Sequence, residues 1–256
     1  MKKKGPGIFE KKRDPHTLAL TMGFAVLLLL MGCFAIFAAR RVRQAGAPQS
    51  GIAVAPEVGA SEAVPLSYFD DAVFIGNSRT KGFMLYSGLD RATFYTDTGL
   101  TVRSALTDSF AQGTTLQGAL SGRSFGKVYV MLGLNELGWQ YPSVYQDTYR
   151  ELIQMIRAAQ PRAVIYLQAI LPVSASKEAA GEPFTLARIA QYNDLVRALA
   201  AECGCWYLIP GEAVCDATGH LPEEAAADGV HLTKSYCQRW LEYLRTHTVP
   251  EGGAPQ

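Results

Sequence analysis

The sequence predicts an α/β fold in which helices cover both faces of a parallel sheet. Short, continuous apolar runs that stop at glycine or proline alternate with longer segments whose apolar residues recur at helical spacing. A strand buried on both faces has a continuous apolar run, as in parallel sheets, instead of an alternating pattern. The 256 residues have room for one sizeable domain with additional segments, and not for two such domains.

Five segments are strand candidates, because each is short and rich in apolar residues. Glycine or a Leu-Pro pair follows the three strongest candidates, and both commonly end a strand. These three are residues 72–75 before Gly76, residues 127–132 before Gly133, and residues 163–170 before Pro172. The two weaker candidates are residues 93–95 and 206–209.

Three helices are expected after these strands, because apolar residues recur there at the spacing of one helix face. The first runs from Pro142 towards Pro161, the second spans Leu186 to Glu202, and the third starts near Thr233, a residue type favoured at an N-cap. The inward faces of these helices are expected to hold Tyr145, Tyr149, Leu152, Ile153 and Ile156; Ile189, Tyr192, Leu195, Val196 and Leu199; and Tyr236, Cys237, Trp240 and Leu244.

The stretch Leu18–Ala39 is uncharged and almost wholly apolar. As a helix it would be about 33 Å long, which is enough to cross the hydrocarbon core of a bilayer. A cleaved signal peptide also combines a basic start with an apolar run, but that run is usually about 7–15 residues long and precedes small residues. Here the run ends directly in Arg40-Arg41-Val42-Arg43, so we expect an uncleaved transmembrane anchor.

Positive charges lie on both sides of this span, and their balance predicts its orientation. Six lysine or arginine residues precede it and three follow it, which favours a cytoplasmic N-terminus and an extracytoplasmic main domain at the cell membrane. We therefore expect a basic cytoplasmic N-terminus (1–17), a transmembrane signal anchor (18–39), a flexible linker rich in alanine, glycine and proline (40–64), a globular domain (65–249) and a disordered tail (250–256).

The composition excludes some classes of function. The net charge is +1, and because the first 43 residues are strongly basic, the remainder is mildly acidic. We therefore expect no nucleic-acid partner for the globular domain. The four cysteines of this domain allow two disulfides in three pairings, or four buried thiols, and both alternatives stay open. Their spacing matches neither a redox nor a zinc motif, so we expect no metal and no cofactor. These cysteines are Cys203, Cys205, Cys215 and Cys237.

A serine follows the first strong strand, in the run Gly76-Asn77-Ser78-Arg79-Thr80. A serine that opens a helix after such a strand has its hydroxyl at the edge of the sheet where ligands bind. Free backbone N–H groups at the helix start can also bind a developing oxyanion. The alternative is a serine that only caps the helix. The run differs from the nucleophile elbow of α/β-hydrolases, because position 80 is threonine instead of glycine.

A second cluster, Gly133-Leu134-Asn135-Glu136-Leu137-Gly138, also follows an apolar strand. The side-chain amide of Asn135 can point over the strand ends as an oxyanion donor, although asparagine is also common in turns.

A serine nucleophile needs a base that titrates near neutral pH, and histidine has that property. The chain contains four histidines. His16 lies on the cytoplasmic side of the expected anchor, His247 lies near the tail, and His220 has no obvious acid beside it in sequence. His231 has Asp228 three residues before it, a spacing that lets the carboxylate fold back onto the imidazole. We therefore expect His231 to be the base and Asp228 to orient it.

In this order, the clusters resemble the SGNH or GDSL hydrolase superfamily. Each block alone is a common pattern, but four blocks in order on a parallel α/β pattern are specific. The resemblance covers residues 69–244, which is nearly the whole globular domain. The matching positions are Ser78, Gly99 in the run Thr98-Gly99-Leu100, Asn135, and Asp228 with His231.

This resemblance implies a three-layer αβα sandwich with a flavodoxin-like sheet and hydrolysis of esters without a metal. It implies that Ser78 attacks the acyl carbonyl, that His231 transfers the proton, and that Asp228 orients His231. It also implies an oxyanion hole formed by the backbone N–H groups of Ser78 and Gly99 and the amide of Asn135.

Three positions depart from the family pattern. Asn77 stands where aspartate is usual, Arg79 where leucine is usual, and Glu136 where aspartate is commoner. We treat these three as candidate substrate contacts. For Arg79 the hypothesis is a cation that faces the pocket and favours a negatively charged substrate, and the alternative is a solvated arginine in the first helical turn.

The expected function is that of an extracytoplasmic serine esterase or acylhydrolase, with an acylated carbohydrate of the cell envelope or a small ester as its substrate. An acetyl ester is one candidate. The alternatives are a lipid esterase near the membrane, an acyltransferase that uses the same acyl-enzyme, and a non-catalytic binding module on this fold.

Overall fold

The computed structural model describes residues 57–110 and 113–249. In this part of the chain, five parallel strands form one sheet with the order β2-β1-β3-β4-β5. The expectation of an α/β fold with a parallel sheet is confirmed. The strands are β1 (Ala72–Gly76), β2 (Thr93–Thr96), β3 (Lys127–Met131), β4 (Val164–Gln168) and β5 (Trp206–Leu208).

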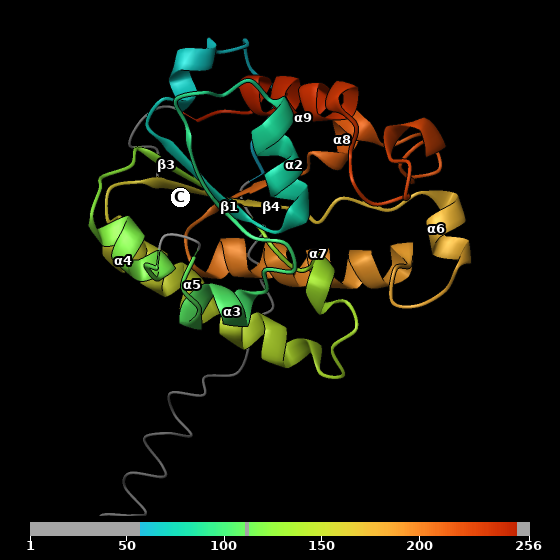
Figure 1. The fold of residues 1–256 in the computed structure, drawn as a ribbon, viewed down its shortest axis with the longest axis horizontal. Coiled ribbons are helices and arrows are strands. Elements are labelled where there is room, and N and C mark those ends of the chain that lie inside the picture. Colours follow the sequence, from blue (N-terminus) through green and yellow to red (C-terminus); the bar gives the residue numbers. More distant parts are fainter. Residues whose placement is uncertain (1–56, 111–112, 250–256) are drawn as a thin grey trace, which may run out of the picture. The chain divides into compact units, whose positions relative to one another are not determined.

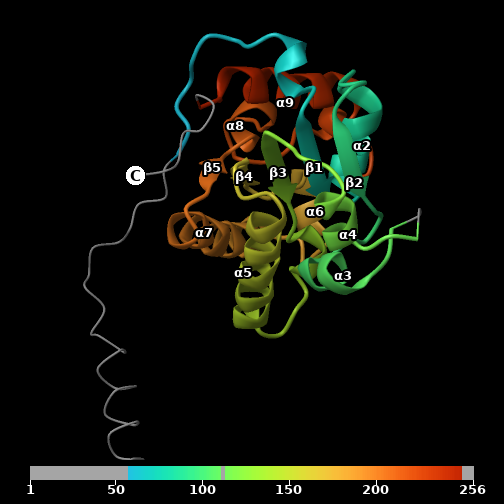
Figure 2. The ribbon, with the colours of Figure 1, turned by 90° about the vertical axis from the view of Figure 1, so that its left-hand side faces the viewer.

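Helices cover both faces of this sheet. Figures 1 and 2 show α2, α8 and α9 on one face and α3, α4, α5 and α7 on the other, which is the expected three-layer arrangement. The α-helices are α2 (Ser78–Tyr86), α3 (Val102–Thr107), α4 (Leu116–Ser121), α5 (Pro142–Ala159), α6 (Ala175–Ala179), α7 (Leu186–Glu202), α8 (Gly211–Val214) and α9 (Lys234–Thr246). Short 3₁₀ turns are η1 (Leu66–Phe69), η2 (Leu134–Glu136) and η3 (Glu223–Ala225).

The expected elements are present, with differences at their ends. Helix α7 has the expected bounds, while β4 is shorter than the apolar run at residues 163–170. Thr233 occupies the N-cap position of α9, but its side chain makes no capping hydrogen bond. Its Oγ1 instead lies 3.2 Å from Ser235 Oγ, so Thr233 is the N-cap residue, as expected, without a side-chain hydrogen bond to the helix backbone.

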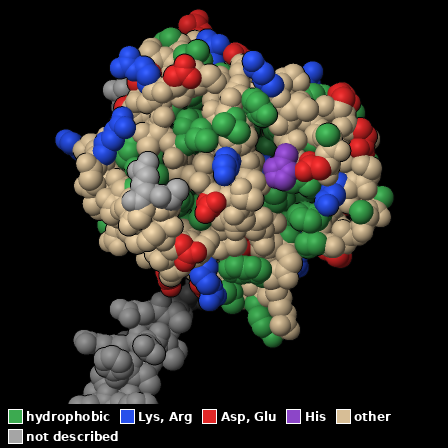
Figure 3. All heavy atoms as spheres, viewed as in Figure 1, with side chains coloured by type: hydrophobic (Ala, Val, Ile, Leu, Met, Phe, Trp, Pro, Cys, Tyr) green, Lys and Arg blue, Asp and Glu red, His purple; other side chains and the backbone are tan. Residues whose placement is uncertain are grey.

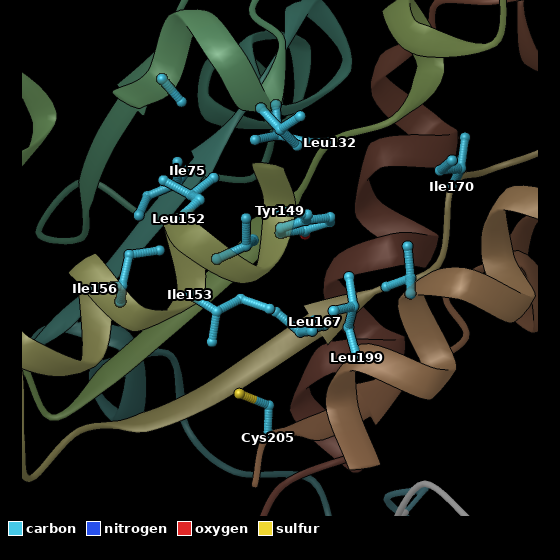
Figure 4. Close-up of a cluster of buried hydrophobic side chains, with 14 of the residues drawn as sticks. Ile75, Leu132, Tyr149, Leu152, Ile153, Ile156, Leu167, Ile170, Leu199 and Cys205 are labelled. Carbon is cyan, nitrogen blue, oxygen red and sulfur yellow. The ribbon is translucent and has the colours of Figure 1, made fainter. Parts of the chain in front are cut away.

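Each strand contributes to a core on both faces of the sheet. Val73 and Ile75 of β1 belong to the core under α5 and α7, and Phe74 belongs to the core under α2 and α9. Figure 4 shows part of the first core, where Leu152 and Ile156 of α5 lie near Ile75. This burial on both faces explains why the strand is apolar at every position.

An aromatic ladder crosses four strands on the face that α2 and α9 cover. Phe94, Phe74, Tyr129 and Tyr166 occupy paired positions on β2, β1, β3 and β4. Their ring centroids are separated by 4.9, 4.7 and 4.6 Å, and the rings are nearly parallel. These distances match the spacing of neighbouring strands, so the register of the sheet stacks the rings.

The order of the strands determines where a ligand can bind. From β1 the chain passes to β2 on one side and then to β3 on the other, so the order reverses between β1 and β3. In open parallel sheets, ligands bind beyond the carboxyl ends of the strands at this switch point. The loops after Gly76 and Met131 therefore define the candidate site.

The globular domain includes residues that we expected in the linker. The Val58 N–H donates to Tyr207 O at 3.3 Å, and the Val64 N–H donates to Arg245 O at 2.9 Å. Residues 57–64 therefore lie against the domain, which corrects its expected start at Pro65. The expected anchor, the rest of the linker and the tail lie outside the described residues. Within residues 57–110 and 113–249, no helix is long and apolar enough to cross a membrane.

The four cysteines of the described domain are free thiols. Cys205 and Cys237 are buried, and burial raises the pKa of each of these thiols to about 12. Of the two alternatives left open by the sequence, the structure has free thiols, but Cys203 and Cys215 are only half-buried. Among the described residues, no group of three or more His, Cys, Asp or Glu side chains is placed to hold a metal ion.

Candidate active site

Ser78 is the first residue of α2, immediately beyond the end of β1. The chain turns sharply here, and a Cβ at Gly76 would lie 2.0 Å from Thr80 Oγ1 and 2.8 Å from Met131 O. Only glycine fits this close approach. Asn77 is the N-cap of α2, and its Oδ1 accepts a hydrogen bond from the Arg79 N–H at 3.1 Å. The cap thus directs the Ser78 side chain to the carboxyl edge of the sheet.

Ser78, His231 and Asp228 form a continuous chain of hydrogen bonds. His231 Nε2 lies 2.8 Å from Ser78 Oγ, and His231 Nδ1 lies 2.6 Å from Asp228 Oδ2. The loop closes on itself, because Asp228 Oδ1 accepts from the N–H groups of Val230 and His231 at 2.9 and 2.8 Å. Gly229 makes this reversal possible with a φ of 73°. The structure therefore joins two residues that are 153 positions apart in the sequence.

The surroundings of Asp228 keep it ionised. Burial alone would raise the pKa of Asp228, but hydrogen bonds from the His231 ring and from two backbone N–H groups outweigh burial and lower the pKa well below its usual range. An ionised Asp228 accepts from Nδ1–H, which assigns the proton of neutral His231 to Nδ1. Nε2 is then free to accept the proton of Ser78.

Gly99 lies in a tight turn beside the end of β1. The Leu100 N–H donates to Asp97 O at 3.3 Å, and the Asp97 N–H donates to Gly76 O at 3.4 Å. Gly99 has a φ of 80° at the third position of the turn, a value that belongs to type II turns and favours glycine. No described residue accepts a hydrogen bond from the Gly99 N–H, so this N–H is available to an oxyanion.

Asn135 lies in η2, at the end of the neighbouring strand β3. The 3₁₀ turn begins at Gly133, which has a φ of 125° and where a Cβ would lie 2.4 Å from Ile170 Cδ1. Asn135 Nδ2 donates to Leu100 O at 2.9 Å, so it is linked to the Gly99 turn. A side-chain amide has two hydrogens, and the second remains available for a substrate oxygen.

The expectation that Asn77, Arg79 and Glu136 contact substrate is not supported by their burial. Their side chains are 1%, 3% and 0% exposed. Asn77 caps α2, and the guanidinium of Arg79 donates to three backbone carbonyls. Arg79 is therefore neither a cation facing the pocket nor a solvated arginine, which corrects both readings of this residue.

The Glu136 carboxylate binds the start of α3, which follows the Gly99 turn. Its Oε1 accepts from the Val102 N–H at the start of α3 at 2.7 Å, while its Oε2 has no partner among the described residues. Burial raises the pKa of Glu136 to about 7, although hydrogen bonds from backbone N–H groups oppose this shift. The Tyr192 hydroxyl donates to Glu136 O at 2.7 Å and holds the backbone of η2 from the side of α7.

The other two histidines of the described residues, His220 and His247, bind partners away from Ser78. His220 Nε2 lies 2.6 Å from Glu178 Oε2, and His220 Nδ1 lies 2.8 Å from Thr218 Oγ1. The sequence offered no acid for His220, because Glu178 is 42 positions away. His247 stacks on Tyr243 with ring centroids 3.8 Å apart, and His16 lies outside the described residues.

A small pocket of about 180 Å³ lies beside the Gly99 turn. No local pattern in the sequence predicts this pocket, because the turn, α3 and the residues after α3 form it together. The side chains around it are mainly short and polar or acidic, so the pocket suits a ligand with hydrogen-bond donors. Its lining is Asp97, Thr98, Gly99, Leu100, Ser104, Asp108, Ser109 and Phe110.

The face of the described domain in Figure 3 carries side chains of both charges. Lysine and arginine side chains are scattered there among acidic ones instead of forming a basic patch.

A parallel α/β sheet with hydrogen-bonded serine, histidine and aspartate at its carboxyl edge has the architecture of a serine hydrolase. The model of the GDSL-like Lipase/Acylhydrolase family matches residues 74–236, and the chain belongs to this family. The protein is therefore an ester hydrolase, as the sequence predicted.

Solved structures share this fold. A Streptococcus pneumonia protein, provisionally assigned as a platelet activating factor, matches with a TM-score of 0.57 and 19% identity over 88% of this chain and 97% of its own. A GDSL-like lipase from Bacteroides thetaiotaomicron has a TM-score of 0.54 and 16% identity, over 70% and 88% of the two chains. A Bacteroides fragilis protein, provisionally assigned as an acylhydrolase, has the same TM-score and identity over 75% and 89%. No curated protein matches the chain.

Proposed function

We propose that this ester hydrolase uses Ser78 as its nucleophile and removes small O-acyl groups, such as acetyl, from carbohydrate. The main support for Ser78 as the nucleophile is the distance of 2.8 Å between Ser78 Oγ and His231 Nε2. A hydroxyl is a weak nucleophile unless a base takes its proton, and this distance permits that transfer.

The proposed reaction has two steps. In the first, Ser78 Oγ attacks the acyl carbonyl while His231 takes the hydroxyl proton, and His231 then gives that proton to the departing alcohol. In the second, His231 takes a proton from water, which attacks the acyl-enzyme. His231 then returns this proton to Ser78 Oγ as the ester bond breaks, which releases the carboxylic acid and restores free Ser78. The Ser78 and Gly99 N–H groups and the Asn135 amide stabilise the oxyanion in both steps. Asp228 stabilises the imidazolium that forms on His231.

The polar pocket supports a carbohydrate substrate over a lipid. It adjoins the Gly99 turn, and its Asp97 and Asp108 carboxylates accept hydrogen bonds from hydroxyl groups. A long acyl chain would instead need an apolar channel. None of the large exposed hydrophobic side chains of the described residues lines the polar pocket. They are Leu66, Leu85, Tyr86 and Tyr141.

Labelling with a fluorophosphonate tests the nucleophile. The full chain in detergent is incubated with the probe, with Ser78→Ala as the control, and turnover of aryl acetate and aryl laurate is compared. We expect the wild type to be labelled and to prefer the acetate, and Ser78→Ala to show neither labelling nor turnover. Equal labelling of both proteins would exclude Ser78 as the nucleophile.

The same experiment separates the alternative functions. Preference for the laurate would favour a lipid esterase, and absence of both labelling and turnover in the wild type would favour a binding module. Acetylated oligosaccharide incubated with a second sugar distinguishes hydrolysis from transfer. Free acetate is expected, whereas acetyl on the acceptor sugar would identify a transferase.

We also propose that the Leu18–Ala39 segment anchors the protein in the cell membrane, with the catalytic domain outside the cytoplasm. The length and apolarity of this segment and the excess of positive charge before it support the proposal. Protease treatment of intact cells and of lysed cells is the test. The domain should be cleaved in intact cells, and protection until lysis would contradict the orientation.

A further inference from the structure

A buried guanidinium lies next to the proposed nucleophile. Arg79 follows Ser78 in the first turn of α2 and is 3% exposed. Its three nitrogens donate to backbone carbonyls: Nε to Val230 O at 2.9 Å, Nη2 to Pro172 O at 2.7 Å, and Nη1 to Leu171 O. Among the described residues, Arg79 forms no salt bridge with a carboxylate, so carbonyl oxygens replace its hydration.

These carbonyls belong to two loops that border the candidate site. Leu171 and Pro172 follow β4, and Val230 immediately precedes His231. The three acceptors lie 92, 93 and 151 positions from Arg79 in the sequence. A further hydrogen bond, from the Ser174 N–H to Gly229 O at 2.9 Å, joins the same two loops. Arg79 therefore links the start of α2 to both loops at once.

A cation in such a position is costly unless each of its donors is satisfied. Burial lowers the pKa of Arg79 to about 10, while Cys215 and Asp228 oppose this shift. The side chain stays charged at neutral pH, so all three hydrogen bonds are charge-assisted. The planar guanidinium presents its donors in a rigid fork, whereas a lysine ammonium is a compact charge on a flexible stem. Lysine could keep the charge here but not this geometry.

We propose that Arg79 is a positioning residue that fixes the distance between Ser78 and His231 through the backbone on either side of them. The inference rests on the proposed roles of these two residues. Ser78 and His231 each lie next to one end of the Arg79–Val230 hydrogen bond. Apart from the bond between Ser78 and His231 themselves, it is the only hydrogen bond among the described residues that joins α2 to the His231 loop. Misplacing a reacting group by about 1 Å can reduce a rate by about 10²-fold.

Arg157 provides a matched control. Its guanidinium also donates to two backbone carbonyls, Ala163 O at 2.9 Å and Gly204 O at 3.0 Å. These acceptors lie just before β4 and β5, at the amino ends of the strands and therefore at the edge of the sheet opposite Ser78. An Arg157 substitution should thus disturb loop packing without changing the Ser78–His231 distance.

The test compares Arg79→Lys, Arg79→Gln and Arg157→Lys with the wild type. The measurements are kcat and KM for an aryl acetate, the rate constant of fluorophosphonate labelling, and the Tm. We expect both Arg79 variants to lose about 10- to 100-fold in kcat and in labelling rate, with KM nearly unchanged. Arg79→Lys should recover little of this loss. Arg157→Lys should lower the Tm while keeping the kcat of the wild type.

Two outcomes would overturn the positioning role. One is a folded Arg79→Lys with the kcat and labelling rate of the wild type. The other is evidence that Arg79 serves stability alone. That evidence would be a failure of both Arg79 variants to fold, or a decrease in kcat that is in proportion to the decrease in Tm for the Arg79 and Arg157 variants alike. A wild type without labelling or turnover would instead contradict the proposed function, so the two failures are distinguishable.

Discussion

At the scale of single residues, the site contains two kinds of side chain: those that can reach a substrate, and buried ones that fix the position of the first kind. Ser78, Asn135 and His231 have polar atoms at the carboxyl edge of the sheet, while Arg79 and Glu136 are buried directly beside them in the sequence. Both buried residues bind backbone atoms of the neighbouring loops. Arg79 and Glu136 therefore affect the site indirectly, because they hold the backbone that carries the reacting groups.

Glu136 should make the stability of the protein depend on pH. Its pKa is about 7 in the folded protein against an ordinary value of 4.5, so between these values the folded state holds a proton that the unfolded chain releases. The contribution of Glu136 to stability is complete below pH 4.5 and is lost as pH rises through about 7. This loss amounts to about 3 kcal/mol.

Chemical denaturation at several pH values from 5 to 8 measures this effect. In Glu136→Gln, the free energy of unfolding should lack the decline between pH 5 and 7, because glutamine does not titrate. Glu151→Gln, at an exposed position on α5, is the control and should retain the decline. An unchanged pH dependence in Glu136→Gln would contradict the raised pKa.

At the scale of elements, the turns after β1, β2 and β3 bring the functional groups together. Each turn contains a glycine that the geometry requires: Gly76 by close approach, and Gly99 and Gly133 by a positive φ. The strand ends and their glycines could be recognised in the sequence because they are local features. The hydrogen bond from Asn135 to Leu100 O could not be recognised in the sequence, because it joins two different turns.

Gly99→Ala and Gly88→Ala separate backbone strain from catalysis. Both glycines have a positive φ, 80° and 77°, and a Cβ at either would meet no atom within 4 Å. Each alanine variant should therefore lose about 1 kcal/mol of stability from the left-handed backbone alone. Only Gly99→Ala should also lose turnover, by about 10-fold or more, because relief of the strained φ at residue 99 turns a proposed oxyanion donor, its N–H, away from the oxyanion.

The comparison needs the free energy of unfolding and the kcat of both variants. Gly88 follows the far end of α2, away from Ser78, and so controls for strain. Equal turnover in the two variants would exclude Gly99 from the oxyanion hole.

At the scale of the whole molecule, stability comes from a core on each face of the sheet. Five parallel strands, helices α5 and α7, and the α/β class could be predicted because their apolar patterns are continuous or periodic in the sequence. The strand order and the aromatic ladder could not be predicted, because a local pattern does not specify which strand lies beside it.

Two buried tyrosines of α5 test how polar groups are satisfied in this core. Tyr145 and Tyr149 are both 0% exposed. The Tyr145 hydroxyl donates to Leu132 O at 3.1 Å, whereas the Tyr149 hydroxyl has no partner among the described residues. Tyr145→Phe should cost about 1 kcal/mol, because Leu132 O loses its donor. Tyr149→Phe should be neutral or stabilising, because it removes an unsatisfied hydroxyl.

Urea denaturation of the two variants provides the measurement. Because the same atom is deleted from the same helix, the difference between the two variants isolates the hydrogen bond. A destabilisation of Tyr149→Phe equal to that of Tyr145→Phe would show that the Tyr149 hydroxyl has a partner after all.

The sequence by itself determined the fold class, the position of Ser78 after β1, and the pairing of His231 with Asp228. These depend on local patterns: an apolar run that ends in glycine, and a hydrogen bond that spans three residues. Only the tertiary structure decided that Arg79 is buried and that Glu178 is the partner of His220, because those contacts join segments at least 42 positions apart. Such contacts leave no periodic pattern in the sequence, because they form only when the sheet brings the loops together.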